Sequence, residues 1–107
     1  MRRGDLITVS LARDYGKPRP AIVVQSDQFL ILESVTVVPL TSSTSDFNPL
    51  RIHLAPTAEN GLRLKSQVMI DKIQSLPRDK ARDIIGHISD EDLAEVNRAL
   101  AVFLGFA

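Results

Sequence analysis

Residues 16–27 read GKPRPAIVVQSD, a turn with two prolines around one arginine that leads into an apolar run. Each proline fixes its own φ angle and favours an extended conformation in the residue before it, so Lys17 and Arg19 are expected to be extended. The run from Ala21 to Val24 is continuously apolar and rich in β-branched side chains, which is typical of a strand buried on both faces. The sequence therefore predicts Arg19 at the mouth of a rigid core strand.

Arg19 allows two interpretations. An arginine beside a strand is most often a solvated or salt-bridged surface residue. However, the prolines on both sides restrict Arg19, and a cation that must meet a phosphate in a fixed geometry benefits from such pre-organisation.

Length and composition indicate a single globular domain over residues 1–107. The chain has 107 residues, of which 44% are hydrophobic and 24% charged, as in ordinary globular proteins. It has no apolar run of about 18 residues, so no membrane contact is expected, and residues 1–5 lack the apolar core of a signal peptide. The absence of cysteine excludes disulfides, thiolate catalysis and Cys-based zinc sites, and fits a reducing cytoplasm.

Charge is balanced overall but unevenly distributed. The 13 basic and 13 acidic residues cancel, yet residues 1–20 are mainly basic and residues 77–107 mainly acidic. This distribution excludes a long electrostatic footprint on nucleic acid but allows a compact patch that binds a few phosphates.

Hydrophobic patterning predicts several short strands. They are expected over residues 6–11, 21–24, 34–40, 51–54, 66–73 and 84–88. Pro39 marks a strand end, and Asn60-Gly61 is a hairpin signal. Residues 27–31 fit either a loop or a short helical turn, and residues 78–83 also allow helical structure.

The last predicted element is an amphipathic helix. Ser89 is the expected N-cap with Asp92 at the capping-box spacing, and Gly105 can end the helix. The apolar stripe comprises Leu93, Val96, Leu100, Phe103 and Leu104. Short strands closed by one such helix favour a mainly β fold, a small, partly open barrel.

Chemistry-bearing motifs are few. His53 and His87 are far apart, and there is no HExxH, GxGxxG, Walker or GxSxG motif, so no metal or cofactor is expected. The remaining candidates for chemistry are Arg19 before a predicted strand, the hydroxyls of Thr41 and Ser42 after another, and Asp71-Lys72. RNA supplies its own 2′-hydroxyl nucleophile, so cleavage needs only charge stabilisation and proton transfer from the protein. The alternative interpretation is that Arg19 is an ordinary surface residue and that Thr41 and Ser42 belong to an ordinary Ser/Thr-rich turn, with no role in catalysis.

Five segments together resemble the MazF/PemK (Kid) family of toxin–antitoxin endoribonucleases, in the family's order. They are Arg3-Gly4-Asp5, residues 16–24 (GKPRPAIVV), residues 38–42 (VPLTS), Asn60-Gly61-Leu62 and residues 66–72 (SQVMIDK). The resemblance implies an SH3-like barrel of the CcdB/MazF/Kid type and a homodimer. It also implies metal-independent cleavage of single-stranded RNA to a 2′,3′-cyclic phosphate, and a cognate antitoxin protein as partner.

By position, the resemblance implies that Arg19 and Thr41 are catalytic and that Asp71 lies near the scissile phosphate. It further implies RNA contacts from Lys17, Ser42, Gln67 and Lys72.

Two features depart from the family pattern. Met69 occupies the position of a second arginine in some members, and the turn from Ala12 to Lys17 is shorter than in members with a long loop there.

Two other functions remain as alternatives. A gyrase poison of the CcdB kind shares the barrel, but such proteins act through a C-terminal end that carries tryptophan, and this chain has no tryptophan. The other alternative function is a barrel that binds a peptide and catalyses no reaction.

Overall fold

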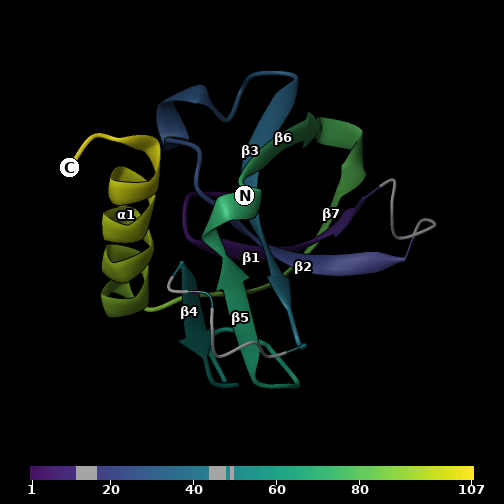
Figure 1. Cartoon of the computed structure of the whole chain (residues 1–107). Coiled ribbons are helices and arrows are strands. Elements are labelled where there is room, and N and C mark those ends of the chain that lie inside the picture. The colour runs from purple at the N-terminus through teal and green to yellow at the C-terminus, as the bar shows by residue number, and fades with distance from the viewer. Residues whose placement is uncertain (12–16, 44–47, 49) are drawn as a thin grey trace.

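The computed structural model describes residues 1–11, 17–43, 48 and 50–107, and within them the fold is mainly β (Figure 1). The strands are β1 (Asp5–Ser10), β2 (Pro18–Val23), β3 (Ser34–Thr41), β4 (Arg51–Leu54), β5 (Ser66–Met69), β6 (Gln74–Pro77) and β7 (Ala81–His87). Helix α1 spans Asp90–Leu104, and short 3₁₀ turns occupy Asp27–Phe29 (η2), Ile70–Lys72 (η3) and Arg78–Lys80 (η4). No helix in the described residues is long and apolar enough to cross a membrane.

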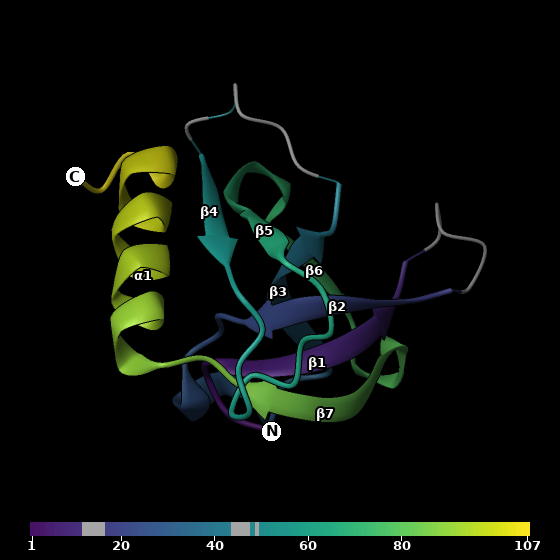
Figure 2. The same cartoon turned by 90° about the horizontal axis from the view of Figure 1, so that it is seen from below.

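The strands form one antiparallel sheet in the order β4-β5-β3-β2-β1-β7, with β6 also paired to β3. Helix α1 lies along one side of the strands in both views (Figures 1 and 2). The described residues therefore confirm the predicted mainly β fold with one C-terminal helix.

The buried apolar side chains form two clusters, one on each face of the central strands. Ile22 and Val24 belong to the cluster that includes Val96 and Leu100 of α1. Ala21 and Val23 belong to the other, which η2 and β6 close through Leu30 and Leu76. Since all four residues from Ala21 to Val24 are buried, the predicted strand with two buried faces is confirmed.

Both ends of α1 follow the sequence-based prediction. The backbone N–H of Asp92 donates to Ser89 Oγ at 3.1 Å, and Gly105 ends the helix with a φ angle of +85°. The apolar stripe is only half covered, because Val96 and Leu100 are buried whereas Phe103 and Leu104 are exposed.

The prediction of one strand over residues 66–73 is wrong. Strand β5 ends at Met69, the turn η3 follows, and β6 begins at Gln74. Val68 pairs with Leu40, and Gln74 with Val37, so residues 69–73 stand opposite only residues 38–39 of β3 and cannot continue one regular ladder. Pro39 lies in that interval and offers no N–H to a ladder, which favours the break. Strand β3 itself continues past Pro39 to Thr41, so Pro39 does not end it.

Other boundaries also differ from the predictions. Strand β7 begins at Ala81 and ends at His87, and helical structure after Pro77 is limited to η4. Residues 27–31 include the short turn η2. Most of the turn before Lys17 (residues 12–16) and the later part of the hydroxyl-rich run (residues 44–46) lie outside the described residues.

The segment between β4 and β5 is fixed by Asn60 and Gly61. Strands β4 and β5 pair as the predicted hairpin, but a long connection joins them. Asn60 is 2% exposed, and its Oδ1 accepts from the backbone N–H groups of Thr57 and Leu62, both at 3.0 Å. Gly61 has a φ angle of +70° and packs against β7, where an added Cβ would lie 2.0 Å from the carbonyl oxygen of Ile85.

We predict that Gly61→Ala destabilises the fold far more than Gly105→Ala. Both glycines have positive φ angles, which cost an alanine about 1–2 kcal/mol, but a Cβ on Gly105 would have no atom within 4 Å. Because β7 must also move in the Gly61 variant, its expected loss is roughly 2–5 kcal/mol in total. Urea unfolding of both variants measures this, and equal losses would contradict the packing of Gly61 on β7.

Candidate functional site

Two pockets meet at the C-terminal end of β3. The first has a volume of about 250 Å³ and the second about 490 Å³. Both are lined by Arg19, Leu40, Thr41 and Ser42, so together they form a groove, called the β3-end groove below. The sequence-based prediction had already singled out three of these four residues.

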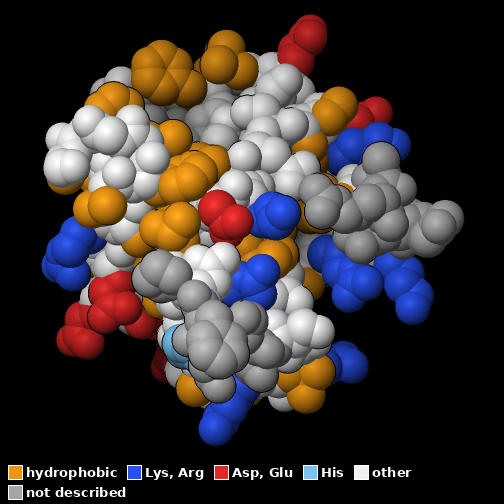
Figure 3. All heavy atoms as spheres, in the orientation of Figure 1, with side chains coloured by type: hydrophobic (Ala, Val, Ile, Leu, Met, Phe, Trp, Pro, Cys, Tyr) orange, Lys and Arg blue, Asp and Glu red, His pale blue; other side chains and the backbone are white. Residues whose placement is uncertain are grey.

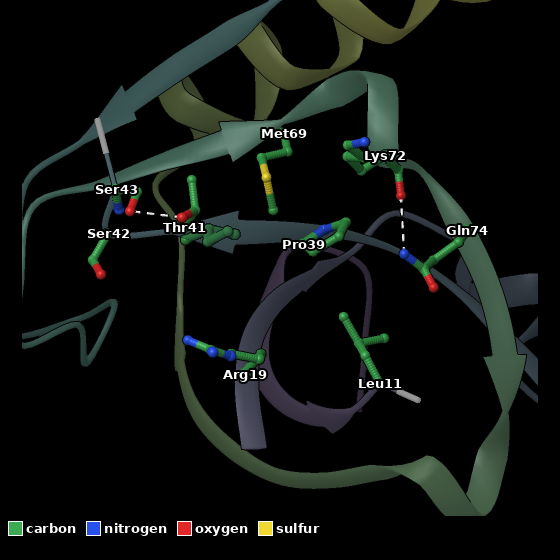
Figure 4. Close-up of a pocket in the computed structure, with 10 residues that line it drawn as sticks. Leu11, Arg19, Pro39, Thr41, Ser42, Ser43, Met69, Lys72 and Gln74 are labelled. Carbon is green, nitrogen blue, oxygen red and sulfur yellow. Dashed lines mark hydrogen bonds between the residues drawn. The ribbon is translucent and has the colours of Figure 1, made fainter. Parts of the chain in front are cut away.

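The pairing of β2 with β3 brings Arg19 and Thr41 to this place. Ala21 pairs with Pro39, and Arg19 and Thr41 lie two residues further along their strands, on the same face as that pair. Figure 4 shows Arg19 and Thr41 on opposite sides of the first pocket, with the guanidinium of Arg19 extending toward the end of β3. Arg19 is exposed and lines both pockets.

A local hydrogen bond orients the hydroxyl of Thr41. Thr41 Oγ1 accepts from the backbone N–H of Ser43 at 3.1 Å (Figure 4), which leaves the hydroxyl hydrogen available to a ligand oxygen. Arg19 and Thr41 therefore offer adjacent donors to one anionic group.

The two pockets extend the groove away from Arg19 with different linings. The first adds Lys72, Met69 and Gln74, and the second adds Arg63 among mainly apolar side chains. Lys72, Arg19 and Arg63 thus distribute positive charge along the groove. The space-filling view also shows Lys and Arg side chains gathered over the strand side of the molecule, while hydrophobic side chains gather beside α1 (Figure 3). A cationic groove of this kind suits an extended polyanion.

Not all predicted site residues line the groove. Lys17 is exposed at the start of β2 but lines neither described pocket. Asp71 is half-buried in η3 next to Lys72. Its Oδ1 is buried and has no hydrogen-bond partner among the described residues. Within the same residues neither Lys72 nor Arg63 forms an ion pair with Asp71, so a salt bridge does not explain its presence.

Gln67, which the sequence predicts to contact the substrate, lies outside both described pockets. Its side chain is 0% exposed. Gln67 Oε1 instead accepts a hydrogen bond from Nη1 of Arg51 at 3.3 Å. Gln67 therefore lies beneath the groove, next to Thr41 with which it pairs across β3 and β5.

Sequence reasoning missed the second pocket and the hydrogen bond between Arg51 and Gln67. Arg63 and Leu64 follow the Asn60-Gly61 signal and reach the groove because Gly61 is held against β7. Arg51 opens a short strand, and no motif distinguished it. Of the two histidines, His53 is exposed, and His87 Nδ1 forms a hydrogen bond with Asp5 Oδ1 at 2.8 Å.

Comparison with known proteins gives consistent results. Residues 2–104 match the family described as "PemK-like, MazF-like toxin of type II toxin-antitoxin system". The chain is 44% identical to a probable endoribonuclease MazF of Mycolicibacterium smegmatis over 100% of this chain and 99% of that protein. It is 29% identical to endoribonuclease MazF9 of Mycobacterium tuberculosis, over 97% of this chain and 96% of that protein.

Solved structures share the fold. A mycobacterial endoribonuclease in complex with its cognate antitoxin superposes with a TM-score of 0.82 at 24% identity, over 100% of this chain and 97% of that one. A MazE–MazF structure from Deinococcus radiodurans gives a TM-score of 0.78 at 24% identity, over 98% and 95%. From the match over nearly its whole length and its 44% identity to a MazF protein, the chain belongs to the PemK/MazF-like toxin family of type II toxin–antitoxin systems.

Proposed function

We propose that the protein is an endoribonuclease toxin that binds single-stranded RNA in the β3-end groove and cleaves it through the RNA's own 2′-hydroxyl. The observation that carries the proposal is the placement of Arg19 and Thr41 as adjacent donors in a groove that also carries Lys72 and Arg63. Family membership and the endoribonuclease names of the relatives support it, and favour it over a gyrase poison or a non-catalytic module.

In the proposed reaction the 2′-oxygen attacks the neighbouring phosphorus, and one proton is transferred overall from the 2′-hydroxyl to the leaving 5′-oxygen. The new oxygen–phosphorus bond forms, the bond from phosphorus to the 5′-oxygen breaks, and the leaving 5′-oxygen takes up a proton. The products are a 2′,3′-cyclic phosphate and a 5′-hydroxyl. Negative charge grows on the non-bridging oxygens in the transition state, which is where fixed donors contribute most.

The residues of the groove have distinct proposed roles. The guanidinium of Arg19 stabilises the charge on the phosphorane and assists proton transfer, and the Thr41 hydroxyl donates to a non-bridging oxygen. Ser42 and Lys72 line the same pocket and bind the strand. Asp71 is proposed to act near the scissile phosphate from η3, where it is the neighbour of the groove residue Lys72. Lys17, exposed before β2, can attract the RNA on approach.

The protein is further proposed to act in the cytoplasm as a homodimer silenced by an antitoxin. Several large apolar side chains on its surface are exposed and available for an interface, namely Leu64, Ile84, Val102, Phe103 and Phe106. Sedimentation of the purified protein tests the dimer. A monomer sediments as a species of 11.8 kDa, and a dimer as a species of twice that mass.

We predict that Arg19→Ala lowers the rate of RNA cleavage by about 10²–10³-fold, the usual cost of losing one transition-state donor. Arg19→Lys should also be severely impaired, because a single ammonium cannot replace the planar guanidinium. Single-turnover cleavage of a long single-stranded RNA measures both rates.

Arg98→Ala is the matched control, since Arg98 is an exposed arginine on α1 beside Leu50 and Ile52 and lies outside the groove. It should cleave like the wild-type protein. Wild-type cleavage by a folded Arg19→Ala variant would sink the proposed role of Arg19.

We predict that the antitoxin encoded beside this gene inhibits cleavage through an extended, acidic and partly apolar segment. Its carboxylates would replace RNA phosphates near Arg19 and Lys72, and its apolar residues would fit the wall of the second pocket. Rising salt should therefore weaken the complex, which titration calorimetry at several NaCl concentrations measures. An antitoxin complex that cleaves RNA at full speed would contradict competition for the groove.

A further inference from the structure

We propose that Arg51 is a second phosphate-binding arginine of this protein, placed on β4 and held in position by the buried Gln67. The inference rests on the proposed function, because it takes the ligand of the groove to be a single strand of RNA. It assigns Arg51 to a phosphate beside the scissile one.

The register of β4 and β5 places Arg51 next to Met69. The two residues are direct cross-strand partners, and such partners project from the same face of a sheet with their Cβ atoms about 4.5–5.5 Å apart. Met69 lines the first pocket, and its side chain points into that pocket in Figure 4. Arg51 is therefore on the same face of the sheet as Met69, one strand further from the centre of the groove.

The same register separates Arg51 from the centre of the groove. Thr41 pairs with Gln67, and Arg51 pairs with Met69, two residues further along β5. Arg51 is therefore two strand spacings across and two residues along from Thr41, roughly 12 Å in all. A guanidinium at that separation reaches a neighbouring phosphate of an extended strand rather than the reacting one. Arg51 should thus affect RNA binding more than the chemical step.

Gln67 fixes the guanidinium of Arg51. Arg51 Nη1 donates to Gln67 Oε1 at 3.3 Å, and Gln67 is 0% exposed. A buried amide anchored between β3 and β4 gives the cation a defined position. This contact also explains why the polar Gln67 lies beneath the groove.

Arg51 differs from the structural arginines in its unused donor. Arg3 and Arg82 use their Nε atoms on Val24 O and Ser10 Oγ, respectively. In contrast, the Nε of half-buried Arg51 has no hydrogen-bond partner among the described residues, nor does Arg51 form an ion pair there. A partly desolvated cation without a counter-ion beside a cationic groove is completed by an anion.

Asp71 offers a competing explanation. Besides Arg51 Nε, Asp71 Oδ1 is the other buried side-chain nitrogen or oxygen without a hydrogen-bond partner in the described part of the chain. Asp71 lies in η3, which directly follows Met69. Arg51 could serve only to pair with Asp71 after a side-chain rearrangement. In that case the two residues would act as a unit, and RNA would not sense Arg51 independently.

The test is the salt dependence of RNA binding. The probe is an RNA that the wild-type protein cleaves, synthesised with 2′-deoxyribose at the cleaved position so that it binds without reacting. Arg51→Gln should weaken binding about 10-fold at moderate salt, as expected for one charge-assisted contact. It should also reduce the slope of log K against log[salt] by about 0.7, the value for one phosphate of a single strand.

Control variants separate phosphate binding from structural effects. Arg98→Gln makes the same charge change on α1 and should alter neither affinity nor slope. Arg51→Lys keeps the charge and loses the fork that holds Gln67, so the slope should be retained with a smaller loss of affinity. The Arg51→Gln effect should also persist in an Asp71→Asn background.

The outcomes are distinct. An unchanged slope in a folded Arg51→Gln variant overturns the inference, as does an effect of that variant that disappears when Asp71→Asn is present. If the wild-type protein cleaves no RNA, the proposed function fails instead. A raised KM with an unchanged kcat in Arg51→Gln supports the inference, whereas a fall in kcat alone contradicts it.

Discussion

The antiparallel pairing of β3 is the interaction on which the described structure depends. β3 forms ladders with β2 along one edge and with β5 and β6 along the other, and its alternating side chains enter both hydrophobic clusters. A shift of one residue in any of these registers would move the buried valines of β3 from one hydrophobic cluster to the other, where the neighbouring side chains do not fit them. Because packing on both faces fixes the register, the positions of Arg19 and Thr41 at the end of the ladder are fixed as well.

Much of this arrangement could be predicted from local patterns. The β-branched run from Ala21 to Val24, the flanking prolines and the capping residues Ser89 and Gly105 each act within a few residues of chain, and each has the expected structure. The break between β5 and β6 could not be predicted in this way, since it depends on which residues of β3 lie opposite. The burial of Gln67 and its hydrogen bond with Arg51 could not be predicted for the same reason, because both depend on pairing across strands.

The electrostatics of the groove arise from folding rather than from composition. A chain with 13 basic and 13 acidic residues gathers Arg19, Lys72 and Arg63 in the two joined pockets. Leaving a buried donor such as Arg51 Nε unpaired costs about 1–3 kcal/mol, a sizeable fraction of the stability of a small domain. A groove with only a few cations matches a substrate held at a few phosphates.

The chemical identity of the RNA ends produced by the purified protein in excess EDTA tests the central claim most directly. The account predicts 2′,3′-cyclic phosphate and 5′-hydroxyl ends, and no cleavage where 2′-deoxyribose replaces the ribose at the cut site, because the substrate's hydroxyl is the nucleophile. Ends with a 5′-phosphate, or cleavage that continues at the 2′-deoxy position, would contradict it.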